Sequence, residues 1–451
     1  MSLPIPLFNY QAQAADIMAT RDRYGLHDEM GIGKTATTIG AIDRIGGERG
    51  MIVCPAMLRE NWIKEFRKFG QRPLRLCKGR NIHDFVAWSR GRFDVLITSY
   101  ELATKWAEDF GKMAEVLDFI AFDEAHYLKN SEAQRTKALF GEDANGENCL
   151  VEWAVHAWHV TGTPMANDPM DIYTFLRFAK AIDMPPNQFV RTFFDSTVST
   201  YGTRNSVKAE MVPILQQLIY NNSIRRMHRD VGMELPPIWM QEILLDGDTR
   251  EIADMVKQYP GLEQAIIDAI EQGGLSFLDA QHIATLRRLV GKSKMIPYAQ
   301  MLEMEMASGA DKRVVFGIHT EPLEYLQHRM LKAGYDFVLV NGSTNENERQ
   351  EAVRRFMQDP SCRGFIGNIK VAGVGLTLTE SCEIDMFESD WSPAGNAQAI
   401  KRIHRYGQRR DVRARFITLA KSIDEAVNRI VAGKTAAIAQ VEGSAMTASI
   451  A

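Results

Sequence analysis

The chain has 451 residues, of which 45% are apolar and 24% charged, and its formal net charge is −4. This composition is typical of a globular protein of two to four domains and gives no global sign of nucleic-acid binding. Five cysteines without a CxxC pair argue against a disulfide framework and against a zinc site. The N-terminus lacks the pattern of a signal peptide, and no apolar run approaches the length of about 18 residues that a membrane span needs. We therefore expect a soluble intracellular protein.

The first motif is the glycine-rich loop HDEMGIGKTATT. It departs from the standard phosphate-binding pattern GxxxxGK[ST], because Asp28 stands where the first glycine belongs. Isoleucines at helical spacing follow, so the loop opens a helix, whose N-terminus favours a negative ligand. The groups that a phosphate site needs are kept by Gly31, Gly33, Lys34 and Thr35, with the Thr35 hydroxyl expected to bind Mg²⁺. The alternative is a helix N-terminus that contains glycines by chance.

Short apolar runs ending in turn or polar residues follow at 51–55, 94–100, 119–126 and 159–164, and helical patterns separate them. This alternation predicts a doubly wound, mostly parallel α/β sheet, whose ligand crevice lies at the carboxyl ends of the strands. In the third run, Asp123 and Glu124 directly follow the apolar strand residues 119–122. We expect Asp123 to hold Mg²⁺ and Glu124 to position and deprotonate a water molecule, although a helix N-cap is the alternative reading of such a pair.

The strand-and-helix pattern resumes from Lys312 without a second lysine loop, which suggests one nucleotide shared at an interface between two lobes. Near the end, residues 401–415 carry seven Lys or Arg against one Asp. Such a run on its own is more often a solvated face. Arg402 and Arg405 are three residues apart, so on a helix both would project from one face as arginine fingers toward a γ-phosphate.

The ordered motifs resemble the Swi/Snf family of superfamily-two helicase-like ATPases. The loop DEMGIGKT, the segments VCPAMLRENWIKEFRKF and ITSYEL, the box DEAH, the turn TGTPMAN with DIYTFLRF, and the block VAGVGLTLTESCEIDMFESDWSPAGNAQAIKRIHRYGQ are similar to its successive motifs. RRMHRDVGMELPP resembles the segment that leaves the first helical protrusion of that family, and LRRLVGKSK the approach to the second lobe. The resemblance covers nearly the whole chain and implies a compact, motor-only member nearest to the annealing-helicase branch.

The resemblance also implies roles for individual residues. The nucleotide is expected on the loop residues Glu29, Met30, Gly31, Ile32, Gly33, Lys34, Thr35 and Ala36, on Gln11, which would read adenine, and on Gly375 with Arg402 and Arg405. Coupling of hydrolysis to lobe movement is expected from Thr161, Gly162, Thr163 and Gln398, and close backbone approach from Gly373. Phosphates of DNA are expected at the turns that contain Pro55, Thr98, Ser99, Thr320, Ser343 and Thr344. Departures from the family pattern are Thr377 and Ser392, each in place of Asn, and His27, which we interpret as a packing residue at a strand end.

We therefore expect two tandem RecA-like lobes with parallel sheets and helical insertions at their junction. The predicted boundaries are 1–178 for the first lobe, 179–310 for helical protrusions and linker, 311–432 for the second lobe and 433–451 for a tail. The predicted activity is that of a DNA-dependent, ATP-hydrolysing and Mg²⁺-requiring translocase on double-stranded DNA, monomeric, cytoplasmic or nucleoid-associated, with DNA-bound proteins as further partners. The alternatives are a strand-separating or annealing, fork-remodelling helicase on the same motor, and a nucleotide-dependent nucleic-acid-binding switch with little turnover.

Overall fold

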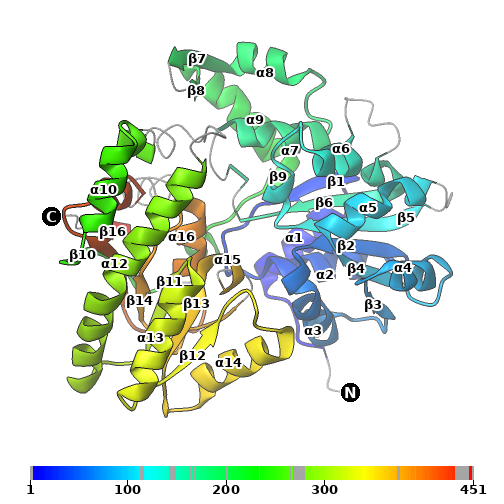
Figure 1. Ribbon diagram of the computed structural model, residues 1–451. Coiled ribbons are helices and arrows are strands. Elements are labelled where there is room, and N and C mark those ends of the chain that lie inside the picture. The colour runs from blue at the N-terminus through cyan, green and yellow to red at the C-terminus, as the bar shows by residue number, and fades with distance from the viewer. Residues whose placement is uncertain are drawn as a thin grey trace. The chain divides into compact units, whose positions relative to one another are not determined.

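The computed structural model describes residues 4–111, 116–141, 149–162, 164–165, 169–199, 202–232, 234–264, 266–267, 280–372, 376–391, 393–431 and 446–448. The chain forms two compact units (Figure 1). The first comprises Met1–Thr197 with Arg204–Gly232, and the second comprises Val198–Thr203 with Met233–Ala451. Each unit is an α/β structure built on a parallel sheet, so the predicted fold class is confirmed.

The first unit is built on a seven-stranded sheet in the order β3-β4-β2-β5-β6-β1-β9, and every strand pair described in it is parallel. Its strands are β1 (Arg23–Leu26), β2 (Gly50–Cys54), β3 (Leu76–Lys78), β4 (Val95–Ser99), β5 (Leu117–Asp123), β6 (Ala154–Val160) and β9 (Ser223–Ile224). Its helices are α1 (Asn9–Ala19), α2 (Lys34–Arg44), α3 (Arg59–Phe69), α4 (Ile82–Ser89), α5 (Tyr100–Gly111), α6 (Gln134–Phe140), α7 (Ile172–Phe178), α8 (Pro186–Phe193) and α9 (Val212–Asn222). The strands β7 (Phe194–Ser199) and β8 (Gly202–Val207) form a separate two-stranded sheet.

Alternate residues of the central strand β5 point to opposite faces of this sheet, as the two-residue repeat of a strand requires. Ile120 and Phe122 belong to the hydrophobic cluster that the sheet forms with α4 to α7. On the other face Phe119 stacks on Trp158, whose indole N–H donates to the Met18 carbonyl of α1 at 3.1 Å. Both faces of the sheet are therefore covered, and its strands are apolar on both sides.

The second unit has a seven-stranded sheet in the order β12-β13-β11-β14-β15-β10-β16, also parallel throughout its described pairs. Its strands are β10 (Ile238–Leu245), β11 (Arg313–Gly317), β12 (Asp336–Val340), β13 (Cys362–Asn368), β14 (Glu383–Met386), β15 (Val412–Leu419) and β16 (Met446–Ala448). Its helices are α10 (Arg250–Gln258), α12 (Ala280–Ala307), α13 (Thr320–Lys332), α14 (Glu346–Gln358), α15 (Ile369–Ala372) and α16 (Pro393–Ile400). Side chains of α12 and α13 pack on one face, and those of α14 and α16 on the other.

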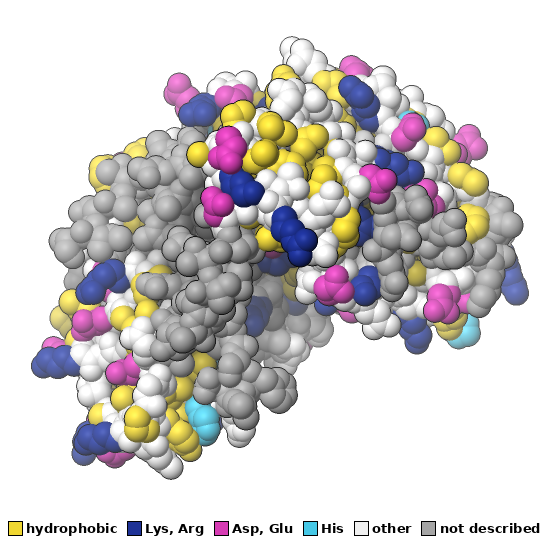
Figure 2. Space-filling model, turned by 90° about the horizontal axis from the view of Figure 1, so that it is seen from above, with side chains coloured by type: hydrophobic (Ala, Val, Ile, Leu, Met, Phe, Trp, Pro, Cys, Tyr) yellow, Lys and Arg dark blue, Asp and Glu magenta, His cyan; other side chains and the backbone are white. Residues whose placement is uncertain are grey.

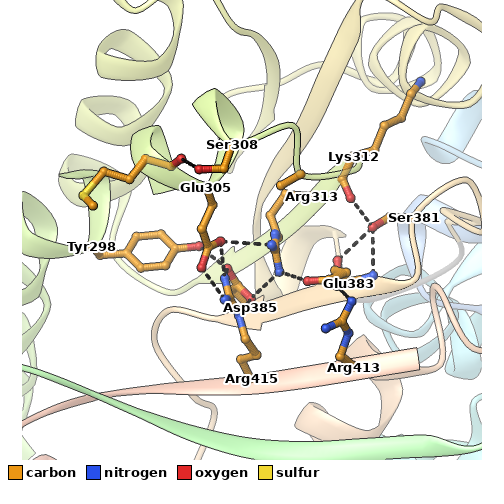
Figure 3. A network of polar contacts seen from close by, with 12 residues as sticks. Tyr298, Glu305, Ser308, Lys312, Arg313, Ser381, Glu383, Asp385, Arg413 and Arg415 are labelled. Carbon is orange, nitrogen blue, oxygen red and sulfur yellow. Dashed lines mark hydrogen bonds and ion pairs between the residues drawn. The ribbon is translucent and has the colours of Figure 1, made fainter. Parts of the chain in front are cut away.

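A buried ionic network joins α12 to three strands of the second sheet (Figure 3). Asp385 on β14 is fully buried and accepts hydrogen bonds from Arg415 of β15 at 2.7 Å and from the Tyr298 hydroxyl at 2.6 Å. Arg313 on β11 contacts Asp385 and also pairs with Glu305 of α12 at 3.0 Å. Every charged side chain in this network has a partner of opposite charge, as buried charges require.

Two sequence expectations differ from the structure. The interval 179–310 was expected to be helical, but it also contains the β7–β8 pair, the edge strand β9 of the first sheet and β10 of the second sheet. Strand β10 is half exposed in an alternating pattern, and such a short pattern is easily read as an amphipathic helix. The second difference is that α16 ends at Ile400, so Arg402 and Arg405 lie in turns after the helix and not on one helical face. The lobe boundaries at 178, 310 and 432 stay predictions.

Helix α9 carries large apolar side chains that are exposed. Val212, Ile214 and Tyr220 are 36%, 50% and 78% exposed. Figure 2 shows the face above α8 and α9, where hydrophobic side chains gather among charged ones. No helix in the described parts of the chain combines the length and the apolar character that crossing a bilayer requires.

Candidate nucleotide site

The glycine-rich loop connects β1 to the first residue of α2. Gly31 and Gly33 have φ values of 89° and 92°, a left-handed conformation that a glycine adopts without strain. A Cβ atom at Gly33 would lie 2.3 Å from the Gln11 side-chain nitrogen, so a larger residue would displace that amide in addition to being strained by the positive φ. The loop therefore brings backbone N–H groups to the N-terminus of α2, which is the arrangement that binds phosphate in many proteins.

Lys34, the first residue of α2, turns its side chain back over the loop. Its ammonium group donates to the carbonyl oxygens of Asp28 at 2.9 Å and Glu29 at 3.3 Å. A Cβ atom at Gly162 would lie 3.1 Å from the same nitrogen and 2.8 Å from Met30, so the TGTP turn lies directly against the loop. The lysine thus sits where the loop, the end of β6 and the N-terminus of α2 meet.

Helix α1 contacts the loop through two side-chain hydrogen bonds. The Tyr10 hydroxyl donates to the Ile32 carbonyl at 2.8 Å, and the Gln11 amide nitrogen donates to the same carbonyl at 3.1 Å. The Gln11 amide oxygen accepts from the Phe8 backbone N–H at 3.0 Å. Gln11 therefore connects α1 to the loop, while adenine recognition by its side chain stays a prediction. Thr35 is half-buried, and Ala36 is buried below the loop in α2.

The acid pair lies at the carboxyl end of β5. The Trp62 indole N–H donates to the Asp123 carboxylate at 2.8 Å, and the Tyr100 hydroxyl donates to the Asp123 carbonyl at 2.8 Å. Glu124 has a φ of 52°, and its backbone N–H donates to the Asp123 carboxylate at 3.0 Å. A left-handed conformation is unusual for glutamate, and such strain is often kept at functional sites.

The environment of Asp123 raises its pKa to about 7. Burial is the main cause and the neighbouring Glu124 carboxylate adds to it, while the Trp62 hydrogen bond and the Lys34 ammonium act in the opposite direction. The effect of Lys34 shows that the loop lysine and the acid pair share one electrostatic environment. A divalent cation bound at Asp123 would favour the ionised carboxylate.

A histidine connects the acid pair to the turn after β6. His126 Nδ1 lies 3.3 Å from the Glu124 carboxylate and 3.3 Å from the Thr161 hydroxyl. Thr161 is fully buried, and its N–H donates to the Leu26 carbonyl at 3.1 Å. Thr161 therefore bonds to the start of the loop on one side and to the DEAH segment on the other, which suits the coupling role predicted for it. Thr163 lies outside the described residues.

The two acidic loop residues are bonded to a distant segment that the sequence analysis did not assign to this site. Asp28 is fully buried and accepts from the backbone N–H and the Nε of Arg226, both at 3.0 Å, and from a third donor, Nη2 of the same guanidinium. Glu29 accepts from the backbone N–H of His228 at 3.1 Å and contacts its Nδ1 at 2.6 Å. The sequence analysis noted the segment RRMHRDVG that contains Arg226 and His228, but the segment is about 200 residues from the loop in the sequence, and no local pattern indicates that the two are in contact.

His27 forms a buried pair with His159 across β1 and β6. His27 Nε2 lies 3.0 Å from His159 Nδ1, and the His27 ring packs on Phe175. Burial is the main cause that lowers the pKa of His27 well below its ordinary value and that of His159 to about 3. Both rings are therefore neutral near pH 7, which suits the packing role expected for His27.

The arginines predicted as fingers belong to the second unit. Arg402 is buried, and its carbonyl accepts from the Leu378 N–H at 2.9 Å, while Arg405 donates to the Leu376 carbonyl at 3.2 Å. Gln408, which the sequence analysis did not select, donates to the carbonyls of Thr379, Ser381 and Ile403 and accepts from the next two backbone N–H groups. Gln398 is half-buried on α16, and Thr377 is half-buried before Leu378. Gly373, Gly375 and Ser392 lie outside the described residues.

The predicted DNA contacts fall into two groups. In the first unit Pro55, Thr98 and Ser99 are buried; the Thr98 hydroxyl donates to the Gly79 carbonyl at 3.4 Å, and Ser99 accepts from the Leu102 N–H at 3.4 Å. These hydrogen bonds lie within the first unit, and the DNA contacts predicted for the three residues stay predictions. In the second unit Thr320 begins α13 and is exposed, and exposed Ser343 and half-buried Thr344 precede α14. Their DNA contacts stay predictions.

The residues of the first unit fit a Mg²⁺ ion bound together with phosphate. Among the described residues there is no group of three or more His, Cys, Asp or Glu side chains that could hold a metal ion. Mg²⁺ needs no such cage, since it commonly takes one or two protein oxygen ligands and completes its shell with phosphate and water. The Thr35 hydroxyl and the Asp123 carboxylate are oxygen ligands of that kind.

Comparison with known proteins gives matches along most of the chain. A family model described as the SNF2-related domain matches residues 10–286, and one described as the helicase conserved C-terminal domain matches residues 294–407. One solved structure, the Sulfolobus solfataricus SWI2/SNF2 ATPase core in complex with dsDNA, aligns over 98% of this chain and 94% of its own at 20% identity, with a TM-score of 0.44 that is too low to support an inference.

Among curated proteins, the relatives include Protein CHROMATIN REMODELING 5 of Arabidopsis thaliana, 25% identical over 89% of this chain and 25% of its own length. SWI/SNF-related matrix-associated actin-dependent regulator of chromatin subfamily A-like protein 1 of Drosophila melanogaster is 24% identical over 94% of this chain and 54% of its own length. Chromodomain-helicase-DNA-binding protein 1-like of Mus musculus is 26% identical over 91% of this chain and 46% of its own length. The chain spans between about a quarter and about half the length of these relatives.

Proposed function

The chain belongs to the family of SNF2-related, helicase-like ATPases, and from this premise we propose that it is a motor that hydrolyses ATP when bound to duplex DNA and moves along that DNA. The observation that carries the proposal is a chain of contacts in the first unit: the Gly162 turn lies against Lys34, and Thr161 of the same turn contacts His126, which contacts Glu124 beside Asp123. A loop lysine, a carboxylate for a metal ion and a second carboxylate for a water molecule are the parts that phosphoryl transfer to water requires.

In the proposed reaction, the loop N–H groups at Gly31 and Gly33 and the Lys34 ammonium bind the phosphates of ATP. Glu124 orients the attacking water and accepts its proton. Thr35 and Asp123 would hold Mg²⁺, which when bound neutralises charge on the phosphates. The hydrogen bonds from Trp62 and Tyr100 keep Asp123 and the end of β5 in place.

The second unit is proposed to supply Arg402 and Arg405 to the γ-phosphate, with the hydrolytic cycle driving relative movement of the two units. Hydrogen bonds from Arg405 and Gln408 hold the turn that carries the two arginines to residues 376–381, which precede β14. A movement of this turn would therefore be passed on to β14. An arginine of this kind contributes about 10³ to 10⁵ in rate where it has been measured.

DNA as the partner is supported by the names of the relatives, which describe chromatin remodelling and DNA binding for those proteins. We propose that one chain acts as the motor, that it contacts DNA mainly through phosphates, and that its further partners are proteins bound to DNA. Membership of the annealing-helicase branch stays part of this proposal.

The test is ATP turnover without nucleic acid and with duplex DNA, single-stranded DNA or RNA. Duplex DNA is expected to raise turnover strongly, and the increase should fall steeply with salt because phosphate contacts release counterions. Lys34→Ala should abolish turnover, whereas Lys68→Ala, which removes a half-exposed lysine of α3, should retain it. Basal hydrolysis that duplex DNA leaves unchanged would contradict the proposal and favour the nucleotide-dependent binding switch.

A second pair of assays separates the motor from the helicase alternative. Triplex displacement reports movement along duplex DNA, and strand displacement on blunt and forked duplexes reports unwinding. We expect triplex displacement without efficient unwinding of plain duplex. Efficient unwinding would instead support the strand-separating or annealing, fork-remodelling enzyme on the same motor.

A further inference from the structure

The nucleotide loop of this chain contains two adjacent carboxylates, Asp28 and Glu29, where the standard phosphate-binding loop begins with glycine. Negative side chains beside a bound phosphate would repel it, and the repulsion is strong where water is excluded. Asp28 is fully buried and Glu29 is 5% exposed, so water screens neither charge effectively. A polyphosphate bound at the loop therefore requires that other groups compensate these two carboxylates by opposite charge or by hydrogen bonds.

The segment 226–228 supplies those groups. Arg226 surrounds the Asp28 carboxylate with its Nε, its Nη2 and its own backbone N–H. His228 presents its backbone N–H and its Nδ1 to the same oxygen of Glu29, at 3.1 Å and 2.6 Å. All four donors with given distances lie within 3.1 Å of a carboxylate oxygen, so both acidic side chains are directed toward this segment.

The backbone fixes the same arrangement. The N–H of His27 donates to the Ile224 carbonyl at 2.8 Å and that of Glu29 to the Arg226 carbonyl at 2.9 Å, which continues the parallel pairing of β1 with β9 into the loop. The carbonyls of Asp28 and Glu29 in turn accept from the Lys34 ammonium. A displacement of segment 226–228 would therefore be transmitted through two residues to the lysine.

Arg226 is held on its other side by helix α1. Its Nη1 donates to the Tyr10 carbonyl, and its guanidinium carbon lies 5.1 Å from the centroid of the Tyr10 ring. The Tyr10 hydroxyl donates to the Ile32 carbonyl of the loop. Arg226 thus contacts both Tyr10 of α1 and Asp28 of the loop. We expect this buried ion pair to fix the geometry of the loop more than it adds to stability.

We propose that Arg226 and His228 are positioning residues of the nucleotide site: the Arg226 guanidinium compensates the charge of Asp28, His228 holds Glu29 by hydrogen bonds, and together they set the loop, and through it Lys34, for binding the phosphates of a nucleotide. The inference rests on the proposed function in that the loop binds ATP or ADP. It assigns part of the nucleotide site to the last residues of the first unit, since that unit ends at Gly232. A nucleotide-dependent shift of the loop would act directly on the segment through which the chain enters the second unit.

The test measures binding of ADP and of adenosine to the full chain, without DNA, by competition against a fluorescent ADP analogue. Arg226→Met leaves the Asp28 charge uncompensated, so it should raise the Kd for ADP about tenfold or more and leave the Kd for adenosine within about twofold. Adding Asp28→Asn to this variant should restore ADP affinity to within about threefold of wild type, because the uncompensated charge is then gone. A merely structural role of Arg226 would weaken ADP and adenosine alike.

Arg23→Met is the matched control. The Arg23 side chain is 11% exposed and pairs with Glu152 elsewhere in the first unit, compared with 13% for Arg226. This control should bind ADP like the wild type. If Arg226→Met does not fold, Asp28→Asn alone decides: it should bind ADP as tightly as or more tightly than wild type, and a tenfold weaker Kd would overturn the inference.

The outcomes separate this inference from the proposed function. ADP binding by Arg226→Met that equals wild type would overturn the positioning role while DNA-stimulated turnover still supported the motor. ADP binding with the expected variant effects, but without DNA stimulation, would support the positioning role and contradict the motor. A wild-type chain that binds no ADP would overturn both. His228→Ala should raise the Kd for ADP in the same direction as Arg226→Met, and an unchanged Kd would remove His228 from the proposal.

Discussion

Replacing Arg415 by Met tests the ionic network that holds the second unit together (Figure 3). The substitution removes two hydrogen bonds of 2.7 Å to the fully buried Asp385 and two of 2.6 Å and 2.9 Å to Glu305. Methionine keeps an unbranched apolar stem but lacks the guanidinium. Among the residues that the structure describes, the Asp385 side chain then retains Arg313, at 3.4 Å, and the Tyr298 hydroxyl, at 2.6 Å.

The magnitude follows from the burial of each partner. A hydrogen bond to a charged group contributes about 1.5 to 3 kcal/mol, so the two bonds to Asp385 amount to about 3 to 6 kcal/mol. Glu305 is 27% exposed, and water replaces part of what it loses. Since Arg313 and Tyr298 remain, we expect a loss near the lower limit, about 3 kcal/mol, which is a large part of the 5 to 15 kcal/mol that stabilises a typical domain.

Hydrogen exchange of the β14 and β15 amides measures this loss. About 3 kcal/mol corresponds to exchange about a hundredfold faster. The control is Arg329→Met, which removes an ion pair with Glu303 whose side chains are 39% and 34% exposed and which should change exchange little. Equal exchange in the two variants would refute the reasoning.

The pH dependence has a definite sign. Burial alone would raise the pKa of Asp385, but Arg313 and Arg415 outweigh it and hold the pKa below its ordinary value. A carboxylate with a lowered pKa in the folded state stabilises it above the unfolded pKa of about 3.9, and this contribution is lost as pH falls through the folded value. The difference between wild type and Arg415→Met should therefore shrink below about pH 4.

Three further predictions concern the first unit. Glu124→Gln should lower kcat by about 10² to 10⁴ while ADP affinity stays within about threefold, and an unchanged kcat would remove Glu124 as the base. Trp62→Phe removes a hydrogen bond to the Asp123 carboxylate, so the Mg²⁺ concentration for half-maximal ATP turnover should rise about tenfold; the same midpoint as wild type would show that the indole does not support this carboxylate. Burial lowers the pKa of His159 to about 3. Between about pH 6.5 and pH 3, histidine is protonated in the unfolded state but not in the folded state, so the free energy of unfolding decreases as the pH is lowered. His159→Phe should reduce that slope in urea denaturation at pH 6, 5.5 and 5, by about 1.4 kcal/mol per pH unit once the pH is well below 6.5, and an unaltered slope would exclude His159 as its source.

Local patterns in the sequence selected the residues at the core of the candidate nucleotide site. Spacing and residue type alone identified Gly31 and Gly33 as part of a loop that opens a helix, and the structure shows the positive φ values that favour glycine there. The acid pair at Asp123 and Glu124 was found because an apolar strand ends at it, and in a parallel sheet strand ends share one edge. The alternation of strands and helices likewise predicted both α/β units.

The partners of these residues depended on contacts that no local pattern records. Arg226 is 198 residues from Asp28, and it reaches the loop only because β9 pairs with β1 at the edge of the first sheet. Trp62 reaches Asp123 because α3 packs against the face of the sheet to which that carboxylate points. Strand order and register decide such contacts, and periodicity fixes neither of them.

Burial and element ends were also decided by the tertiary structure. Thr98 and Ser99 have the residue types of a phosphate-binding turn, yet packing encloses both side chains. The three-residue spacing of Arg402 and Arg405 suggested one helical face, but α16 ends at Ile400. The sequence by itself therefore determined which chemical groups this protein carries and at which strand ends and helix starts they stand. Only the tertiary structure decided which of them are buried and which distant charge stabilises each, because those depend on how the sheet edges and helices pack.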